Sequence, residues 1–462
     1  MKLLSQLLFL LVTAAAIGAF AWQFRRIMAN IRLGRPLDRN DRPMERLKVM
    51  LLVAFGQKKM FKRWLPAILH GILYVSFIVI NIEVLEIVID GLAGTHRIMG
   101  QFTGVLYDGL MFVNEFLGAL VIVASTILLI RRNVLKVSRF QGPEMANSKG
   151  AITLKNYSHL DANIILVTEI VLMSGLFLFN AADVKLHQMG HGALSPGELP
   201  GVFPISSALA GWGFPGNEVG ILHFWERFGW WAHIVGIYLF LNYLPISKHF
   251  HIIMAFPNVY FSKLEPAGEF SNPKNIQEEV KAAFDYSYTP AVDPNGPKRF
   301  GARDVTDLTW KNLMDSYACT ECGRCTAMCP ANITGKKLSP RKIVMDVRDR
   351  LEEVQKYHLV PDENGVLIPG NGVAGAEEAA GHFLLSDHYI TAEELHACTT
   401  CNACVEACPV NIDQVSIITE LRRYLVMEES AMPHEWSIMI QNMENSGNPW
   451  AMPAASRGDW MN

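Results

Sequence analysis

The sequence predicts an all-α protein in two parts: a bundle of five transmembrane helices, followed by an α-helical soluble domain. Three observations predict this division. Almost all long apolar runs lie before residue 255, and all eight cysteines lie after residue 318. The soluble part repeats apolar residues at helical spacing and shows no alternating strand pattern. The chain has 462 residues, which is too long for one ordinary domain.

Five apolar runs are long enough to cross a bilayer, which takes about 20 residues of helix. They lie at about 3–24, 64–90, 107–130, 161–182 and 224–247. The first run has features of a signal peptide, because one lysine precedes it and it contains the small residues AAAIGA. Its length and the following Arg25 and Arg26 favour a retained anchor instead. We therefore expect a membrane domain over residues 1–254.

Basic residues between the apolar runs predict the orientation of the chain. Segments 25–63 and 131–160 carry twelve and six Lys and Arg residues, whereas 91–106 and 183–220 carry one each. Basic loops stay on the cytoplasmic side. We therefore expect the N-terminus outside, the chain leaving the fifth span inside, and a bacterial cytoplasmic (inner) membrane. The soluble part then lies in the cytoplasm, where thiols stay reduced.

The soluble part begins after a polar segment. Residues 255–305 are rich in Pro, Gly, Asn and charged residues, which predicts a linker. Residues 306–462 then form the soluble domain. Ser339 and Pro340 are typical of a helix start, and residues 412–428 again have helical spacing.

Two stretches of the soluble domain share one cysteine spacing. They read CTECGRCTAMCP from residue 319 and CTTCNACVEACP from residue 398. Each has three cysteines two residues apart, a fourth after three more residues, and then proline, which is the bacterial ferredoxin pattern for [4Fe–4S] clusters. Disulfides suit oxidising compartments, and zinc usually takes two separate CxxC pairs. The repeated pattern therefore favours iron–sulfur clusters over both alternatives.

In two-cluster ferredoxins, the fourth cysteine of each run binds the other cluster. The predicted ligands are Cys319, Cys322, Cys325 and Cys408 for one cluster, and Cys398, Cys401, Cys404 and Cys329 for the second. Because each loop is thereby tied to the other, we expect poor folding without iron. Arg324 and the loop amides would tune the potential. The helical gap of about 70 residues between the stretches favours an all-helical ferredoxin-like domain over the compact βαβ type.

Histidines near the spans indicate b-type haem, which can take two axial histidines from neighbouring helices. His70 lies near the cytoplasmic end of the second span, and His249 and His251 lie at that end of the fifth. We predict one haem held by His70 and His251, or by His70 and His249. On a straight helix His233 shares a face with His251, although Pro245 between them can kink the helix.

A second haem near the outer face would take His233 as one ligand. The second span offers no histidine at that depth, so His96 and His223 are the candidates for its partner. His187 and His191 lie in the Gly- and Pro-rich outer loop, where we expect them to be exposed to solvent.

Four acidic residues lie at membrane depth: Glu83, Glu86, Glu115 and Glu169. Such groups are costly unless they face the bundle interior or a cavity. Two interpretations stay open for each, an interhelical hydrogen bond and a proton relay for quinone chemistry. Glu169 is the deepest and is our first candidate for the relay.

The residues described above resemble known families. The membrane half resembles the cytochrome b subunit of respiratory nitrate reductase, and its fifth span reads WWAHIVGIYLFLNYLPISKHFHII. The soluble half resembles the iron–sulfur subunit of heterodisulfide reductase. Two stretches, DLTWKNLMDSYACTECGRCTAMCPANITGKKLSP and ENSGNPWAMPAASRGDW, are similar to fused membrane-bound iron–sulfur oxidoreductases. That group includes the electron-transfer-flavoprotein:menaquinone oxidoreductases. The second span lacks the second histidine of the nitrate reductase pattern.

The resemblance implies electron transfer between a cytoplasmic donor and the quinone pool, with menaquinone reduced in a respiratory chain. The expected donor is an electron-transferring flavoprotein or a heterodisulfide-reductase-like subunit. Many fused relatives continue into a CCG-motif domain with a further cluster. This chain has no spare cysteine, so we expect that part to be a separate polypeptide in a multi-subunit quinone-linked oxidoreductase. The alternative is a non-enzymatic, membrane-anchored ferredoxin that serves a cytoplasmic redox complex. The net charge of −3 gives no indication of nucleic-acid binding.

Overall fold

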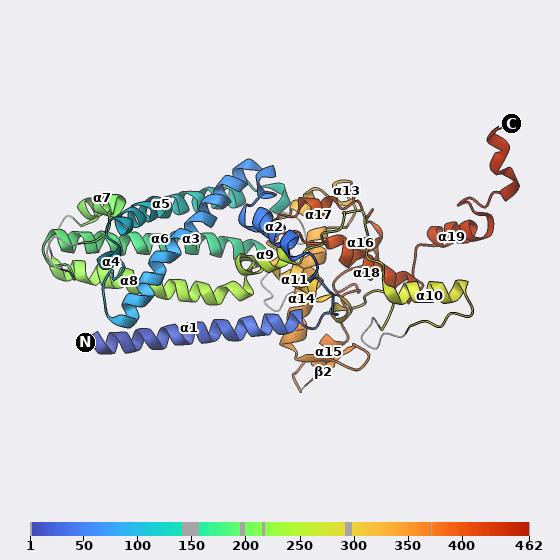
Figure 1. Cartoon of the computed structure of the whole chain (residues 1–462), viewed down its shortest axis with the longest axis horizontal. Helices are drawn as coiled ribbons and strands as arrows, with labels where there is room; N and C mark the ends of the chain where they lie inside the picture. The colour runs from blue at the N-terminus through green and yellow to red at the C-terminus, as the bar shows by residue number, and fades with distance from the viewer. Residues whose placement is uncertain are drawn as a thin grey trace.

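The computed structural model describes residues 2–140, 157–194, 199–214, 218–291, 298–370 and 372–461. Five long helices gather at one end of the molecule, where α3 runs obliquely to the other four (Figure 1). They are α1 (Lys2–Ile31), α3 (Trp64–Ala93), α5 (Val105–Asn133), α6 (Tyr157–Gln188) and α8 (Val219–Tyr243). The shorter helices of the C-terminal domain gather at the other end, so the chain has the expected two-part, mainly helical architecture.

Four of the long helices are long and apolar enough to cross a membrane. They are Leu3–Ile31, Trp64–Ala93, Val105–Asn133 and Ser158–Gln188. The fifth predicted span lies in α8, which is not among the four. Glu226, Arg227 and His233 interrupt the apolar residues of α8, although this helix packs along α6 in the bundle. The fifth span therefore stays a prediction.

The chain beyond α8 is not a straight helix. α8 ends at Tyr243, and two 3₁₀ turns separate it from α9 (His251–Tyr260). Pro245 in the first turn has no N–H to donate, and Ser247 between the turns has extended backbone with ψ of 152°. The prediction that His233 and His251 share one helix face is therefore wrong, because the two residues lie in different helices.

Short elements connect the long helices and build the soluble domain. On the membrane side they are α2 (Pro43–Met50), the π-helical turn η1 (Leu51–Phe55), α4 (Gly100–Thr103) and α7 (Pro204–Gly213). In the C-terminal domain they are α11 (Trp310–Ala318), α12 (Arg324–Ala327), α13 (Pro330–Ile333), α14 (Pro340–Lys356), α15 (Ala376–Ala380), α16 (Ala392–His396), α17 (Ala403–Ala407) and α18 (Gln414–Met427). The remaining helices, α10 (Lys274–Phe284) and α19 (His434–Ser446), lie at the periphery and have no buried residue.

A small hairpin interrupts the helical domain. Strands β1 (Leu359–Pro361) and β2 (Leu367–Pro369) pair antiparallel, with Val360 opposite Ile368. The sequence showed no alternating strand pattern, because strands of three residues are too short to show one.

One hydrophobic core joins the two parts of the chain. Ile31 at the end of α1 belongs to the same core as Leu313 of α11 and Ile417 of α18. Val259 of α9, which lies in the predicted linker, is fully buried in this core. Gly34 allows the two parts to approach closely, because a Cβ there would lie 2.5 Å from the Trp310 amide nitrogen. The C-terminal domain is therefore docked on the bundle.

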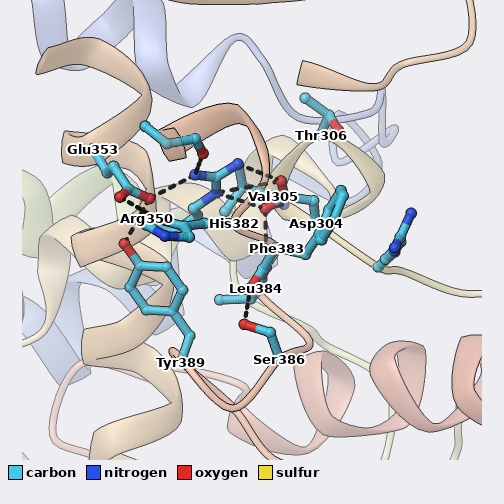
Figure 2. Close-up of polar contacts among 12 residues, drawn as sticks. Asp304, Val305, Thr306, Arg350, Glu353, His382, Phe383, Leu384, Ser386 and Tyr389 are labelled. Atoms are coloured by element: carbon cyan, nitrogen blue, oxygen red, sulfur yellow. Dashed lines mark hydrogen bonds and ion pairs between the residues drawn. The ribbon is translucent and has the colours of Figure 1, made fainter. Parts of the chain in front are cut away.

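A buried ion network holds the C-terminal domain together (Figure 2). Arg350 of α14 is fully buried and donates to Asp304 at 2.8 Å and to Glu353 at 2.6 Å. Glu353 also accepts hydrogen bonds from His382 at 2.7 Å and Tyr389 at 2.9 Å. The network thereby links three segments of the domain. One lies just before the first cysteine stretch, and the other two lie between the two stretches.

Candidate functional site

The two cysteine stretches fold as matched loops. The second and fourth residues after the first cysteine are left-handed in each loop: Glu321 and Gly323 (φ 53° and 69°), and Thr400 and Asn402 (φ 54° and 60°). The amides of Glu321 and Thr400 each donate to the preceding cysteine sulfur, Cys319 or Cys398, over 3.4 Å. Such N–H···S bonds are one means by which a protein tunes a cluster.

The first pocket collects cysteines from both stretches. Cys319, Cys322, Cys325 and Cys408 all line it. Burial raises the pKa of Cys319 to about 12 and that of Cys408 to about 11. As free thiols these groups are protonated at neutral pH, and a bound metal would replace the proton. Four sulfurs around one pocket fit the ligand set of a [4Fe–4S] cluster.

The other four cysteines form a second group. Cys398 and Cys404 interact electrostatically with both Cys329 and Cys401. Three of these come from the second stretch and Cys329 comes from the first, which mirrors the first pocket. Cys401 is exposed at the surface. Within the described ranges all eight cysteines are unpaired, so the sulfurs of this group also fit a cluster.

The structure brings His70 and His251 together at the end of the bundle that faces the cysteines. Their ring centroids lie 6.3 Å apart at an angle of 41°. An iron atom bonded at about 2 Å to one nitrogen of each ring would hold the centroids about 6 Å apart. His251 Nδ1 bonds the Lys248 carbonyl at 3.0 Å, which leaves Nε2 for a ligand. His70 Nδ1 is buried and has no hydrogen-bond partner in the described part of the chain. The pair therefore fits the axial ligands of a haem.

His249 lies next to this pair. Its ring centroid is 5.6 Å from that of His251 and 5.2 Å from that of Phe240, which it meets edge-on. Burial lowers the pKa of His249 to about 3. His249 is therefore neutral at pH 7. The histidine whose ring contacts His70, however, is His251 and not His249.

His233 lies deeper in the bundle and is 1% exposed. Its Nδ1 bonds the Leu172 carbonyl at 2.9 Å, and its Nε2 is buried without a partner among the described residues. Of the two candidates for the other ligand, His223 is exposed and His96 bonds Asp183 at 3.1 Å. No ring contact joins His233 to another histidine within the described ranges.

A buried polar network that the sequence analysis missed lies where α6 ends and the chain turns from α3 into α4. Arg97 is 3% exposed and bonds Asp183 and Asn180, each at 2.9 Å. His187 donates to the Asp183 carbonyl at 2.9 Å and is buried. The expected exposure of His187 is therefore wrong, because α6 extends to Gln188 and carries it into the packed end. His191 is exposed as expected. A lone arginine next to a span, with an aspartate in another span, is the signal that could have indicated the pair.

Three of the four acidic residues at membrane depth are hydrogen-bonded between elements. Glu83 accepts from Asn114 at 3.0 Å, Glu86 from Tyr107 at 2.6 Å, and Glu115 from Ser206 Oγ at 2.6 Å. Glu169 is half-buried and has no polar partner in the described part of the chain. The hydrogen-bonded interpretation therefore accounts for Glu83, Glu86 and Glu115.

The first cysteine loop touches the segments that carry the paired histidines. Arg324 donates to the Lys59 carbonyl at 3.1 Å, in the turn before α3 and His70. Glu321 accepts from Lys248 at 2.9 Å, three residues before His251. Sequence reasoning missed Glu321, because nothing local indicates which distant cation its side chain meets.

Comparisons with known proteins support the iron–sulfur part of this site. Residues 318–412 match the family described as 4Fe-4S dicluster domain. The chain is 32% identical over 470 residues to the probable iron-sulfur-binding oxidoreductase FadF of Bacillus subtilis, covering 98% of this chain and 60% of that protein. It is 28% identical over 439 residues to the EtfAB:quinone oxidoreductase of Syntrophomonas wolfei, covering 92% of this chain and 55% of that protein. A probable membrane-anchored ferredoxin of Chromohalobacter salexigens is 33% identical over 173 residues, covering 35% of this chain and 24% of that protein.

The chain thus has iron–sulfur oxidoreductases among its relatives, as the resemblance implied, and spans 60% and 55% of the length of the first two. No solved structure matches the chain.

Proposed function

We propose that the chain carries single electrons between a cytoplasmic donor and the membrane quinone pool, with menaquinone as the acceptor. Two [4Fe–4S] clusters and a b-type haem would form the path. One observation carries the proposal: the loop of the first cysteine pocket contacts both segments that hold the His70–His251 pair, through Arg324 and Glu321. Sulfur and imidazole sites for redox groups therefore adjoin each other across the interface.

Each set of candidate ligands would hold one redox group of this path. Cys319, Cys322, Cys325 and Cys408 would hold one cluster, and the second group of cysteines would hold the other. His70 and His251 would hold the haem, and these groups supply one-electron chemistry when bound. The buried Nε2 of His233 is open to a ligand, so an outer haem stays a prediction. Glu169 as a proton relay also stays a prediction.

The proposed acceptor reaction balances with two transfers. Two electrons from the donor and two protons from water convert one quinone into one quinol. The Syntrophomonas wolfei relative is named for EtfAB and quinone, and this supports a flavoprotein as donor and a quinone as acceptor. A heterodisulfide-reductase-like partner subunit is the other donor that we propose. The basic loops support an inner-membrane protein with the cluster domain in the cytoplasm.

Anaerobic purification of the chain tests the proposal. We expect about nine iron atoms per chain, eight from two four-iron clusters and one from the haem, together with a b-type absorption in the reduced-minus-oxidised spectrum. His70→Ala should remove the absorption of the haem held by His70 and His251, together with quinone reduction, but keep both cluster EPR signals. His434→Ala, an exposed histidine on α19, is the matched control and should change neither. Quinone reduction that persists in His70→Ala without haem would contradict the proposed path.

A second function is a membrane-anchored ferredoxin without quinone chemistry. The Chromohalobacter salexigens relative favours it, because that protein is named as one and matches 35% of this chain. In that case the membrane histidines are structural. Clusters without b-type absorption in the purified wild-type chain would favour this second function.

A further inference from the structure

Glu321 is a buried carboxylate inside the first cysteine loop. Its side chain is 2% exposed, and it accepts hydrogen bonds from Ser158, Lys248 and Arg348. These three residues belong to separate segments: the start of α6, the turn before α9, and α14. A buried charge is tolerated when it is paired and hydrogen-bonded, and here one carboxylate meets two cations.

Hydrogen bonds connect Glu321 through Lys248 to His251. Lys248 bonds Glu321 through Nζ at 2.9 Å, and its carbonyl accepts from His251 Nδ1 at 3.0 Å. Asp161 of α6 fixes the same turn, because it accepts from the Lys248 amide at 3.0 Å and from Ser247 Oγ at 2.6 Å. The turn that orients His251 is therefore bonded directly to the cysteine loop.

The twin loop shows that folding the cysteine stretch does not require this carboxylate. Thr400 occupies the position of Glu321, with the same left-handed backbone and the same 3.4 Å amide–sulfur bond. Among the described residues, its hydroxyl donates to the neighbouring Thr399 carbonyl, at 2.7 Å, and to no other group. The loop backbone is thus alike in both stretches, and the Glu321 side chain serves the contact with the bundle.

We propose that Glu321 is a positioning residue. It holds the cluster of Cys319, Cys322, Cys325 and Cys408 against the turn that carries His251, which makes this cluster the one that exchanges electrons with the membrane. The inference rests on the proposed function, since it assumes a redox group at the histidine pair. In each transfer one electron leaves the soluble donor and one electron enters the membrane acceptor, so no further oxidant or reductant is needed.

Glu321→Gln tests the role, because it keeps the shape and a hydrogen-bond acceptor but removes the charge. After rapid mixing with a reductant of the clusters, b-type absorption should appear about tenfold more slowly than in wild type, since small displacements can cost up to about a hundredfold in rate. The midpoint potential of one cluster should rise, because a nearby negative charge is lost. Both cluster EPR signals should persist.

Glu406→Gln is the matched control. Glu406 also bridges the two parts of the chain, to Lys62 at 2.5 Å, but its side chain is 67% exposed. Exposed pairs contribute little, so this variant should reduce the membrane site at the wild-type rate. Glu321→Asp, which keeps the charge, should recover part of the lost rate.

A wild-type chain without b-type absorption contradicts the proposed function itself. If wild type has that absorption and Glu321→Gln reduces it at an unchanged rate, the positioning role is wrong. Should Glu321→Gln lose its clusters, Lys248→Gln outside the cysteine loop takes its place. That variant should show the same slowing, and an unchanged rate would overturn the inference.

Discussion

The crossed ligand set makes a prediction for single cysteines. Cys408 lies in the second stretch but lines the pocket of Cys319, Cys322 and Cys325. Cys408→Ser should therefore remove or alter the same cluster EPR signal as Cys325→Ser. Cys401→Ser is the comparison, and it should affect the other signal. If Cys408→Ser and Cys401→Ser changed the same signal, the crossed assignment would be wrong.

The buried pair Asp304–Arg350 predicts a large loss of stability. Arg350 is fully buried, so Asp304→Asn leaves its charge without a full counter-charge. Removal of one partner from a buried pair costs about 3–5 kcal/mol. We expect a clearly lower thermal midpoint for the full chain in detergent, followed by loss of cluster absorbance.

An exposed pair provides the control for that measurement. Lys337 and Glu393 pair at the surface, with side chains 69% and 63% exposed. Glu393→Gln should change the free energy of unfolding by at most about 1 kcal/mol. Equal midpoints for Asp304→Asn and Glu393→Gln would show that the buried pair contributes no more than the exposed one.

At the scale of residues, the sequence predicts the candidate ligands of redox groups better than it predicts which polar side chains pair with one another. The eight cysteines follow a local spacing, so their grouping could be expected before the fold was known. The pairing of His70 with His251 could also be expected, because both lie at the cytoplasmic ends of predicted spans. Glu321 meets Lys248 and Arg348 only through the docking of two domains. Docking depends on contacts between distant residues, and no spacing pattern records it.

At the scale of elements, capping signals predict helix starts well, because they act within one turn. Ser339 caps α14 by accepting from the Lys342 amide, with Pro340 in the first turn, as expected. The break between α8 and α9 was harder to predict, since a proline can either kink a helix or end it. Here α8 ends at Tyr243, just before the 3₁₀ turn that contains Pro245, and the extended Ser247 follows that turn.

The helix that leads into the first cysteine offers an element-scale prediction. Thr309 and Asn312 form a capping box at the start of α11, which ends at Ala318 just before Cys319. Thr309→Ala should cost about 1 kcal/mol and lower the thermal midpoint by about 2–4 °C. Both cluster signals should stay, because the sulfur ligands are untouched. Ser437→Ala on the exposed α19 is the control, and an equal midpoint in both variants would contradict the role of the cap.

At the scale of the whole molecule, the two parts of the chain pack together more closely than the sequence suggests. Composition separates an apolar half from a polar half and predicts a linker at 255–305. In the structure α9 begins before that range and ends within it, and its Val259 is buried in the core that also contains the end of α1 and the cysteines Cys319, Cys329 and Cys408. Averages over composition cannot show this, because the core is built from a few apolar residues of each segment.

That shared core gives a prediction for the loss of iron. Each predicted cluster ties the two cysteine stretches together, and three of the cysteines lie in the core that joins the domain to the bundle. Removal of iron with a chelator under reducing conditions should therefore loosen the C-terminal domain.

Brief trypsin treatment should then cut first near Lys336 and Lys337, which are exposed, and then within α14. The bundle should be cut at the same rate before and after iron removal, because all eight cysteine ligands lie outside it. Reconstitution with iron and sulfide should restore resistance, whereas identical cleavage with and without iron would show that the domain is stable without its clusters.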